Sequence, residues 1–439
     1  MVRGHGLSQK RKPPSLHCHR HCRIRRLRRR SLRANCKPDH LGIATGGIPL
    51  KSFFKVLSAL LTPNFSWVTL LSGVALAVIG INVLTGTTEP AAAAKQTKWL
   101  MISLGMMAFT WLPHPKTIGY TSFILFLVTL ALLVFLLIPG IPNSIVPVRN
   151  NARSWINLGF MNMQPSELTK ITFILALAWY LRHRDNYRTL AGLLPPFFIM
   201  FIPVILILKE PDLGSAVMFV PALFFMLIAA GAKLNHLFTL VGIGLLGIAL
   251  NIVMIYTLPN DMQILKKYQR ERITQFVGTK PEQQQMAMRL VGSGGLWGYG
   301  EDRSKLIMRY NFLPENENDM VFAVVVNRWG LIGGLTVIGL YTVFTGSILL
   351  VGARLKEPFP RLVCVGFAGL LFCQGAMNIS MTLGLLPITG ITLPLISYGG
   401  SSLLSTFLMV GLVMNFATRS RSILVRPSFE YDNADAIFQ

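Results

Sequence analysis

Acidic residues and cysteines are both scarce in this chain, and each scarcity excludes a class of protein. Of 439 residues, 18 are Asp or Glu, and charged residues of both signs make up 14% of the chain. Soluble globular proteins carry about 25% charged residues, so this composition excludes an ordinary soluble domain. The five cysteines show no paired spacing. This excludes the disulfide framework of a small secreted scaffold.

The chain is instead rich in apolar residues, many of them in long continuous runs. Hydrophobic residues make up 52% of the chain, and the mean hydropathy is +0.51. Several runs approach the length of about 20 residues that spans a bilayer, and they are continuous, which excludes a porin-like barrel. We therefore predict an all-α polytopic membrane protein with about ten transmembrane helices. The predicted spans are Trp67–Leu84, Trp99–Leu112, Ile118–Ile138, Leu168–Leu181, Leu193–Leu208, Leu213–Ala232, Phe238–Thr257, Met320–Val351, Leu362–Leu383 and Leu403–Thr418.

The net charge of +24 is concentrated at the N-terminus. Residues 1–40 hold thirteen Lys or Arg against Asp39 alone, about half of the excess. We predict that residues 1–50 form a basic, disordered cytoplasmic tail that contacts anionic membrane lipids. Zinc binding by the Cys/His cluster that contains Cys18 and Cys22 is an alternative, but a second ligand pair at zinc-finger spacing is missing. No nucleic-acid partner is expected, and an over-extended start codon is a further alternative.

Basic residues also predict the topology. An even number of spans puts both termini on one side, where the short loops hold eleven Lys or Arg against five opposite. The positive-inside rule makes that side the cytoplasm of a multi-pass protein of the cell (inner) membrane. Residues 60–420 form the predicted transmembrane domain, and residues 421–439 a cytoplasmic C-terminal tail. Residues 258–319 form a large extracytoplasmic loop between helices 7 and 8, and loops of this length usually carry function.

Two polar stretches precede the fourth and sixth predicted spans on the outer side. The stretch Asn150–Lys170 holds Arg153, Trp155, Glu167 and Lys170. Arginine binds phosphate in a bidentate manner, so these residues are candidates for binding an anionic substrate. The alternative is a helix start with Trp155 at the membrane interface.

The stretch Lys209–Ser215 places Asp212 before a helix. Asp212 is either a helix cap or part of a substrate-binding network.

Two further stretches are rich in glycine or proline. Arg289–Gly300 has five glycines in nine residues, which allows close backbone approach or a phosphate-binding nest. It lacks the Lys-Ser/Thr ending of a P-loop, which excludes that form of nucleotide binding. Gly384–Ser402 cannot continue one helix, so we predict a broken or re-entrant segment that lines a cavity, with a plain outer loop as the alternative. Ser397 and Tyr398 in it are candidate substrate-binding residues.

These stretches, together with the acidic stretch Phe312–Met320, resemble those of a known family. ARSWINLGFMNMQPSELTK, EPDLGSA, YQRERI, GSGGLWGYG, FLPENENDMVFAVV and LPITGITLPLISYGGSS occur in the order seen in SEDS proteins, the shape, elongation, division and sporulation family that includes RodA and FtsW. The resemblance covers Ser66–Arg419 and implies ten transmembrane helices and a peptidoglycan glycosyltransferase that polymerises lipid II. It also implies a class B penicillin-binding transpeptidase as partner. Tyr268–Ile273 favours a RodA-like role in elongation over division.

The resemblance also implies a mechanism. An α-linked donor and a β-linked product require one inverting displacement of undecaprenyl pyrophosphate. Asp319 is the predicted general base for the attacking sugar 4-hydroxyl, and Arg153 and Lys170 hold the pyrophosphate or order the site. Glu315 and Glu317 raise the pKa of Asp319 or help to hold a divalent cation, Mg or Mn, although the sequence makes no cofactor certain.

The chain departs from the family pattern around this aspartate. Glu317 and Asn318 replace a usual His-Thr pair, and Asn311 stands at an often acidic position. Asn327 and Arg328 stand where relatives usually have two acidic residues. These departures predict either altered tuning of the site around Asp319 or reduced glycosyltransferase activity. The departures leave a catalytically weakened scaffold for a transpeptidase as a rival function. A flippase for the lipid-linked precursor is a second rival, since polar residues and broken helices near the outer face suit a transporter too.

Overall fold

The computed structural model describes most of the predicted transmembrane domain. The described residues are 66–85, 90–148, 152–159, 162–184, 186–257, 280–310, 313 and 317–419. The basic tail, the motif Tyr268–Ile273, Asn311 and Glu315 lie outside the described residues.

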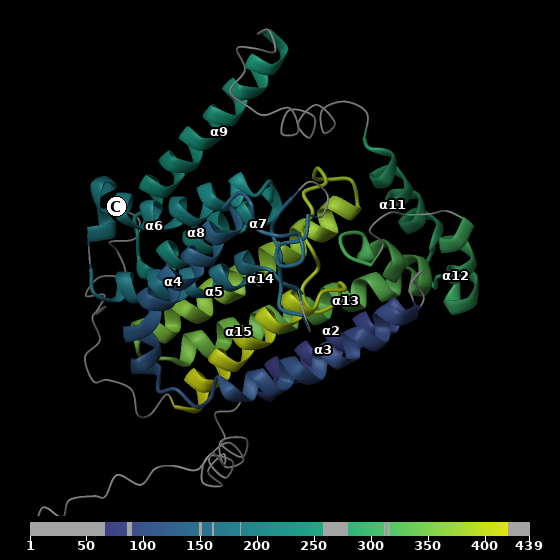
Figure 1. Ribbon diagram of the computed structural model, residues 1–439, viewed down its shortest axis with the longest axis horizontal. Coiled ribbons are helices and arrows are strands. Elements are labelled where there is room, and N and C mark those ends of the chain that lie inside the picture. The colour runs from purple at the N-terminus through teal and green to yellow at the C-terminus, as the bar shows by residue number, and fades with distance from the viewer. Residues whose placement is uncertain are drawn as a thin grey trace, which may run out of the picture. The chain divides into compact units, whose positions relative to one another are not determined.

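The predicted all-α membrane architecture is confirmed (Figure 1). Each predicted span overlaps helical structure, but α3 begins at Pro90 rather than at the predicted Trp99, and the span Leu213–Ala232 is divided between α7 and α8. Seven described segments are long and apolar enough to cross a membrane: α2, α4, α6, α7 with α8, α13, α14 and α15. The remaining predicted spans fold as α3, α5 and α9. The helices are α2 (Trp67–Leu84), α3 (Pro90–Phe109), α4 (Pro115–Leu136), α5 (Pro165–Arg182), α6 (Leu190–Lys209), α7 (Leu213–Val217), α8 (Phe219–Ala230), α9 (Leu234–Thr257), α11 (Glu282–Ser293), α12 (Gly300–Tyr310), α13 (Val321–Arg354), α14 (Pro358–Thr382) and α15 (Gly400–Thr418), with the short 3₁₀ turn η1 (Asn186–Arg188) and strands β1 (Ile156–Asn157) and β2 (Asn162–Met163).

Local sequence explains where several helices begin and end. Pro115 and Pro165 occupy the first positions of α4 and α5, where a missing N–H and a fixed φ are favourable. The Thr189 hydroxyl accepts a hydrogen bond from Gly192 N over 3.1 Å at the start of α6. Gly231 ends α8 in the left-handed conformation, with φ 91°.

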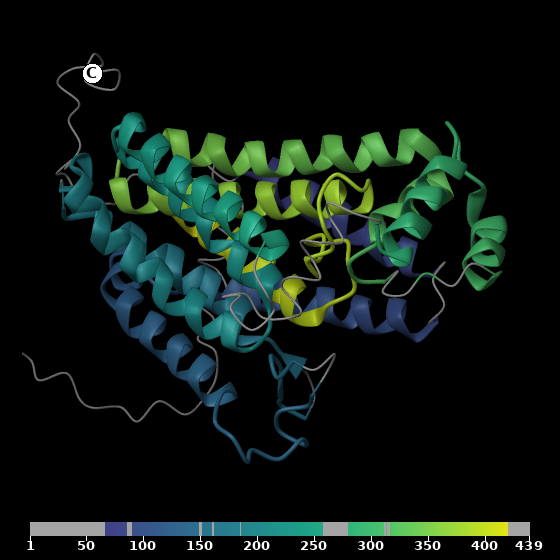
Figure 2. The ribbon, with the colours of Figure 1, turned by 90° about the horizontal axis from the view of Figure 1, so that it is seen from above.

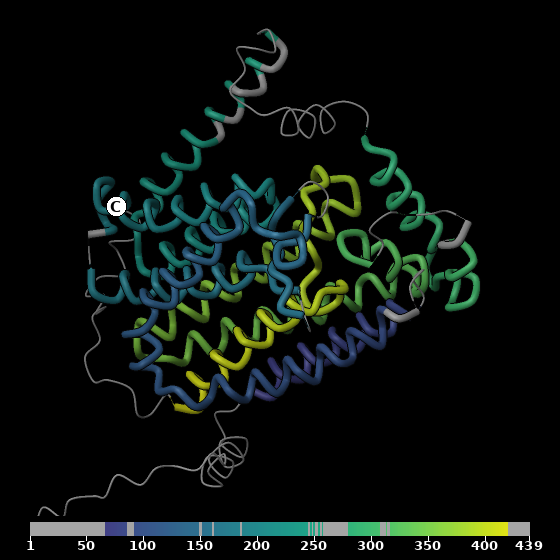
Figure 3. The backbone as a smooth tube through the Cα atoms, in the orientation of Figure 1, coloured from purple at the N-terminus to yellow at the C-terminus, as the bar shows by residue number. Residues whose placement is uncertain are grey.

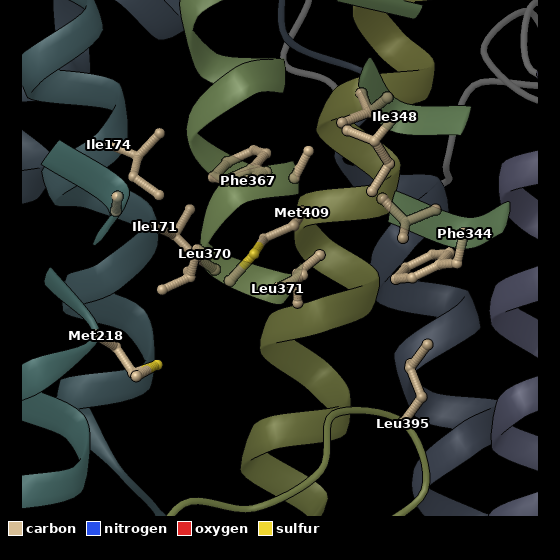
Figure 4. Close-up of a cluster of buried hydrophobic side chains, with 14 of the residues drawn as sticks. Ile171, Ile174, Met218, Phe344, Ile348, Phe367, Leu370, Leu371, Leu395 and Met409 are labelled. Atoms are coloured by element: carbon tan, nitrogen blue, oxygen red, sulfur yellow. The ribbon is translucent and has the colours of Figure 1, made fainter. Parts of the chain in front are cut away.

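The core lies between α5, α8, α13, α14 and α15. Helix α5 is buried along nearly its whole length, so it lies inside the bundle rather than at the lipid surface. Figure 4 shows Ile171 of α5 beside Leu370 of α14, and Met409 of α15 next to Leu371. This interior position explains how α5 can carry Glu167 and Lys170, because a charge inside a membrane protein faces the bundle.

Helix α9 differs from the other helices in its packing. Phe238, Ile243, Leu246 and Leu250 are all more than half exposed, and Figure 1 shows α9 leading away from the packed helices.

Helix α13 is interrupted at Gly330, which has φ 68° and ψ −165°. The part before the interruption, Val321–Trp329, is largely buried, whereas several leucine and isoleucine residues after it are exposed. The predicted span Met320–Val351 therefore consists of a buried entry segment and a membrane-length helix. Figures 1 and 2 place α11 and α12, from the long predicted loop, together at one end of the long helices.

The residues from Gly384 to Gly399 have no helical structure but are buried at their centre. Figure 3 traces this backbone between α14 and α15. Leu393, Leu395 and Ile396 are each at most 1% exposed, so the segment is not a plain outer loop. Its carbonyls accept hydrogen bonds from polar side chains of the surrounding helices, which satisfies the backbone of a buried non-helical segment.

Candidate functional site

The acidic stretch before α13 is held by the non-helical segment that precedes α15. Tyr398 N donates a hydrogen bond to the Glu317 carbonyl over 2.8 Å. Next to it, the Ser397 hydroxyl donates to the Asn318 carbonyl over 2.5 Å and accepts from Leu393 N over 2.8 Å. Two successive carbonyls are thus fixed from one segment. Ser397 and Tyr398 therefore hold the backbone of the acidic stretch, a role that their prediction as substrate-binding residues did not include.

The next carbonyl in the chain is fixed from α14. The Asn378 amide nitrogen donates to the Asp319 carbonyl over 2.8 Å and to the Ile391 carbonyl over 2.6 Å. Asn378 is fully buried and Asp319 is half-buried. A Cβ at Gly390, which has φ 76°, would lie 3.7 Å from Asp319 Oδ2. The Asp319 carboxylate thus lies against the backbone of Gly390, at a position that carries no side chain.

Asp212 caps a helix, the first of the two roles that the sequence left open, and its role in substrate binding stays a prediction. Its Oδ1 accepts from Ser215 N over 3.0 Å and caps α7, while its Oδ2 accepts from the Gln164 side chain over 2.9 Å. Gln164 N in turn donates to the Ser401 hydroxyl over 3.1 Å. Asp212 is therefore a helix cap that also belongs to a polar network.

Glu167 and Lys170 form a buried ion pair. Lys170 Nζ lies 2.7 Å from Glu167 Oε1, and the two side chains are 2% and 8% exposed. The Ser405 hydroxyl donates to the other oxygen of Glu167 over 3.1 Å. An isolated charge in this place would be very unfavourable, so each side chain depends on the other as its partner inside the bundle.

Three serines spaced four residues apart connect these groups. Ser397 holds the acidic stretch, Ser401 contacts the Asp212 network and Ser405 contacts the Glu167–Lys170 pair. Ser401 and Ser405 lie about one helical turn apart on α15, and Ser397 lies three residues before this helix begins at Gly400, so one short segment carries a polar line that contacts all three groups. This spacing is the structural link between stretches that lie far apart in the sequence.

Arg153 is not part of this line. It is half-buried near the hairpin of β1 and β2, and its Nη2 donates to Asn143 Oδ1 over 3.4 Å. The described contacts of Arg153 do not join it to Lys170 or Asp319. Trp155, two residues on, is also half-buried. The predicted joint action of Arg153 and Lys170 on one anionic group therefore stays a prediction.

The comparisons with known proteins identify the family. Residues 57–422 match the family described as Cell cycle protein, which groups FtsW, RodA and SpoVE. The chain belongs to the FtsW/RodA/SpoVE family. It is 32% identical to stage V sporulation protein E of Bacillus subtilis over 68% of this chain and 80% of that protein. It is 34% identical to a probable peptidoglycan glycosyltransferase FtsW of Coxiella burnetii over 67% of this chain and 77% of that protein.

Solved structures agree with the FtsW/RodA/SpoVE assignment. A chain from a peptidoglycan synthase complex, described as coordinating polymerization and crosslinking, matches 82% of this chain and 99% of its own length, with a TM-score of 0.69 and 26% identity. Rod shape determining protein RodA of Thermus thermophilus matches 82% of this chain and 98% of its own length, with a TM-score of 0.60 and 25% identity.

In this FtsW/RodA/SpoVE member, Asn327 and Arg328 brace α12 against α13. The Ser304 hydroxyl donates to Asn327 Oδ1 over 2.8 Å. The Arg328 guanidinium lies 2.5 Å from a carboxylate oxygen of Glu301 and donates to the Asn82 carbonyl of α2 over 2.6 Å. The two departures from the usual acidic pair thus have local partners that suit an amide and a cation.

The glycine-rich stretch makes a close backbone contact. A Cβ at Gly298 would lie 2.3 Å from the Arg328 carbonyl oxygen, and one at Gly330 would lie 2.2 Å from the Leu296 oxygen. Gly298 N and Tyr299 N donate within the protein, to the carbonyls of Gly294 and Asn327. The close approach of two backbone segments, which the glycine-rich stretch predicted, is therefore confirmed. The phosphate-nest alternative is wrong for these two amides, because both already donate to protein carbonyls.

Sequence reasoning missed several polar residues of the site. Asn378, Gln164 and Gln96 are amides in or next to apolar helices, and that contrast was the available signal. Gln96 donates to the Ser397 carbonyl over 3.1 Å and accepts from Gly399 N over 3.2 Å. It therefore positions the segment that holds the acidic stretch.

Glu210 was also missed. It is 2% exposed, and neither carboxylate oxygen has a hydrogen-bond partner among the described residues. Burial, and secondly the negative charge of Asp212, raise the pKa of Glu210 to about 9. At neutral pH the side chain is therefore a neutral acid.

The described residues contain no group of three or more His, Cys, Asp or Glu side chains that could hold a metal ion. The predicted Mg or Mn site would need Glu315, which lies outside the described residues. The divalent cation stays a prediction, and no step below depends on it.

Proposed function

We propose that this chain, a peptidoglycan glycosyltransferase by family, polymerises lipid II with Asp319 as the general base. The observation that carries the proposal is the arrangement of the acidic stretch. Three successive carbonyls, those of Glu317, Asn318 and Asp319, accept hydrogen bonds from buried or half-buried groups. A catalytic carboxylate must be held in a fixed position, and this arrangement fixes its backbone.

The reaction is a single displacement. The 4-hydroxyl oxygen of the acceptor sugar forms a bond to the anomeric carbon of the donor, and the bond from that carbon to the pyrophosphate oxygen breaks. The hydroxyl proton moves to the Asp319 carboxylate, and undecaprenyl pyrophosphate leaves as the anion. Removal of the proton in the transition state makes the hydroxyl a better nucleophile.

Positive charge is needed where the pyrophosphate departs. Lys170 is the buried cation of the polar line along α15, and Glu167 holds its ammonium. We assign Lys170 to the electrostatic stabilisation of the donor. Arg153 is half-buried in the hairpin region and remains a second candidate for binding the same group. Asp212 and Trp155 remain candidates for contacts to the rest of the donor.

We place the site on the extracytoplasmic face of the inner membrane, with both termini in the cytoplasm. The distribution of lysine and arginine between short loops supports this orientation. A class B penicillin-binding transpeptidase is the proposed partner, since a solved relative belongs to a complex of polymerization and crosslinking. A RodA-like role in elongation is proposed over one in division on the stretch YQRERI.

Purified protein with lipid II tests the function. Polymerised glycan supports the enzyme, lipid transfer across vesicles without polymer supports a transporter, and neither product supports a scaffold. Asp319→Asn is the informative variant. Asp302→Asn, which changes an exposed carboxylate of α12, is the matched control and is expected to keep wild-type polymerisation.

A further inference from the structure

The turn between α11 and α12 exposes two large apolar side chains. Trp297 is 79% exposed and Leu296 is 61% exposed. Neither carries an ionised group, and water is a poor environment for both side chains. Exposed apolar groups that lie together on a fixed backbone mark an interaction surface.

This turn is fixed to α13 at a defined height. The Gly295 and Leu296 carbonyls accept hydrogen bonds from Leu331 N and Ile332 N, over 2.9 and 3.3 Å. These donors immediately follow the interruption of α13 at Gly330. The turn therefore cannot move along α13 without breaking backbone hydrogen bonds.

The length of α13 puts this turn level with one boundary of the membrane. From Leu331 to its end at Arg354, α13 has about 24 residues and a length of about 36 Å at 1.5 Å per residue. The hydrocarbon core is about 30 Å thick. Because Arg354 is exposed and marks one boundary, Leu331 lies close to the other. The turn is thus level with the lipid interface at the loop end of α13.

The other end of α11 lies at the same level. Gln284, in its first turn, donates to the Met381 carbonyl over 2.8 Å. Met381 is at the end of α14, which follows α13 after a short connection and runs back for a similar length. A helix with both ends at one level lies along the membrane surface rather than away from it.

The lipid-facing surface of α13 continues into the turn. Leu331, Ile332 and Leu335 are 49%, 45% and 56% exposed on a helix long enough to cross a membrane. Leu296 and Trp297 extend this apolar surface, and Arg289 and Arg303 are exposed on α11 and α12 nearby in the sequence. Tryptophan favours the interface because its ring is amphipathic, and arginine suits anionic headgroups.

We infer that Leu296 and Trp297 form an interfacial membrane anchor, in which the turn inserts into the lipid headgroup and upper acyl region at the loop end of α13. The anchor would keep α11 and α12 on the bilayer.

Fluorophore accessibility tests the anchor in the full-length chain. Leu296→Cys is labelled in a chain whose five native cysteines are replaced, and reconstituted in nanodiscs of phosphatidylethanolamine and phosphatidylglycerol. Leu335→Cys is the lipid-facing control and Asp302→Cys the water-facing control. Because an inserted side chain lies below the headgroups, we expect iodide to quench the Leu296 label at least about twofold less than the Asp302 label. Lipids brominated near the headgroup end should quench the fluorescence of the Leu296 label to a similar extent as that of the Leu335 label.

A second measurement applies if the cysteine-free chain does not fold. Brominated lipids should quench the native fluorescence of the wild-type chain more than that of Trp297→Phe. The anchor is overturned if the Leu296 label is quenched by iodide like the Asp302 label and not by brominated lipid. It is also overturned if Trp297→Phe leaves brominated-lipid quenching unchanged, and a surface that contacts a partner protein would give that result.

Discussion

The Asn378 amide holds the backbone carbonyl of Asp319 at 2.8 Å from inside α14, and the same nitrogen lies 2.6 Å from the Ile391 carbonyl. One buried side chain therefore joins the acidic stretch before α13 to the non-helical segment before α15. Two chain segments about seventy residues apart in sequence are fixed relative to each other at the proposed catalytic carboxylate.

Asp319→Asn tests the general base. Asparagine has nearly the same size, and the carbonyl that Asn378 holds is unchanged, so expression and thermal unfolding should stay close to wild type. Because the amide cannot take the hydroxyl proton, glycan polymerisation should fall by a factor on the order of 10²–10⁴. Measurement of glycan product from purified protein and lipid II checks this. Near-normal product would remove Asp319 from the reaction.

Much of the fold and part of the site could be predicted from the sequence. The spans were visible because membrane helices need long apolar runs, and Asp212 was visible as a cap because of its place before a helix. Polar contacts between segments that are distant in the sequence could not be predicted in this way. The bond from Asn378 to Asp319 depends on how α14 packs, and nothing in the local pattern around residue 378 specifies its partner. Similarly, the Glu301–Arg328 contact depends on a backbone approach at Gly298 and Gly330.

The Glu167–Lys170 pair can be separated into stability and function by a double variant. Breaking a buried ion pair by removing one partner typically costs about 3–5 kcal/mol of unfolding free energy, because the other charge is left unpaired. Lys170→Met and Glu167→Gln should each lower the unfolding temperature in detergent, and the double variant should recover most of that loss.

Polymerisation should stay low in the double variant, because the cation for the pyrophosphate is absent. Recovery of both stability and polymerisation would show that the pair has a structural role alone.

Arg328→Met tests the brace between α12, α13 and α2. The change removes the charged hydrogen bond to the Asn82 carbonyl, and such bonds contribute about 1.5–3 kcal/mol. It also leaves Glu301 with Lys305, which lies 2.6 Å away. We expect a lower unfolding temperature and increased proteolysis between residues 280 and 310. Arg303→Met changes an exposed arginine of the same region and should alter neither measurement. If Arg328→Met and Arg303→Met had the same unfolding temperature and the same proteolysis, Arg328 would not brace α12 against α13 and α2.

Glu210→Gln tests the buried neutral acid at the end of α6. The folded-state pKa of about 9 lies above the ordinary value of 4.5, so the folded chain holds this proton more tightly than the unfolded chain. The contribution of Glu210 to stability is therefore fully present below about pH 4.5 and is lost as pH rises through about 9. Glutamine cannot ionise and has a similar shape. The unfolding temperature of Glu210→Gln minus that of wild type should thus increase steadily between pH 5 and pH 9. Asp302→Asn, at an exposed site, should show no such trend. A difference for Glu210→Gln that stays constant across this range would mean that Glu210 is ionised in the folded protein and has a partner.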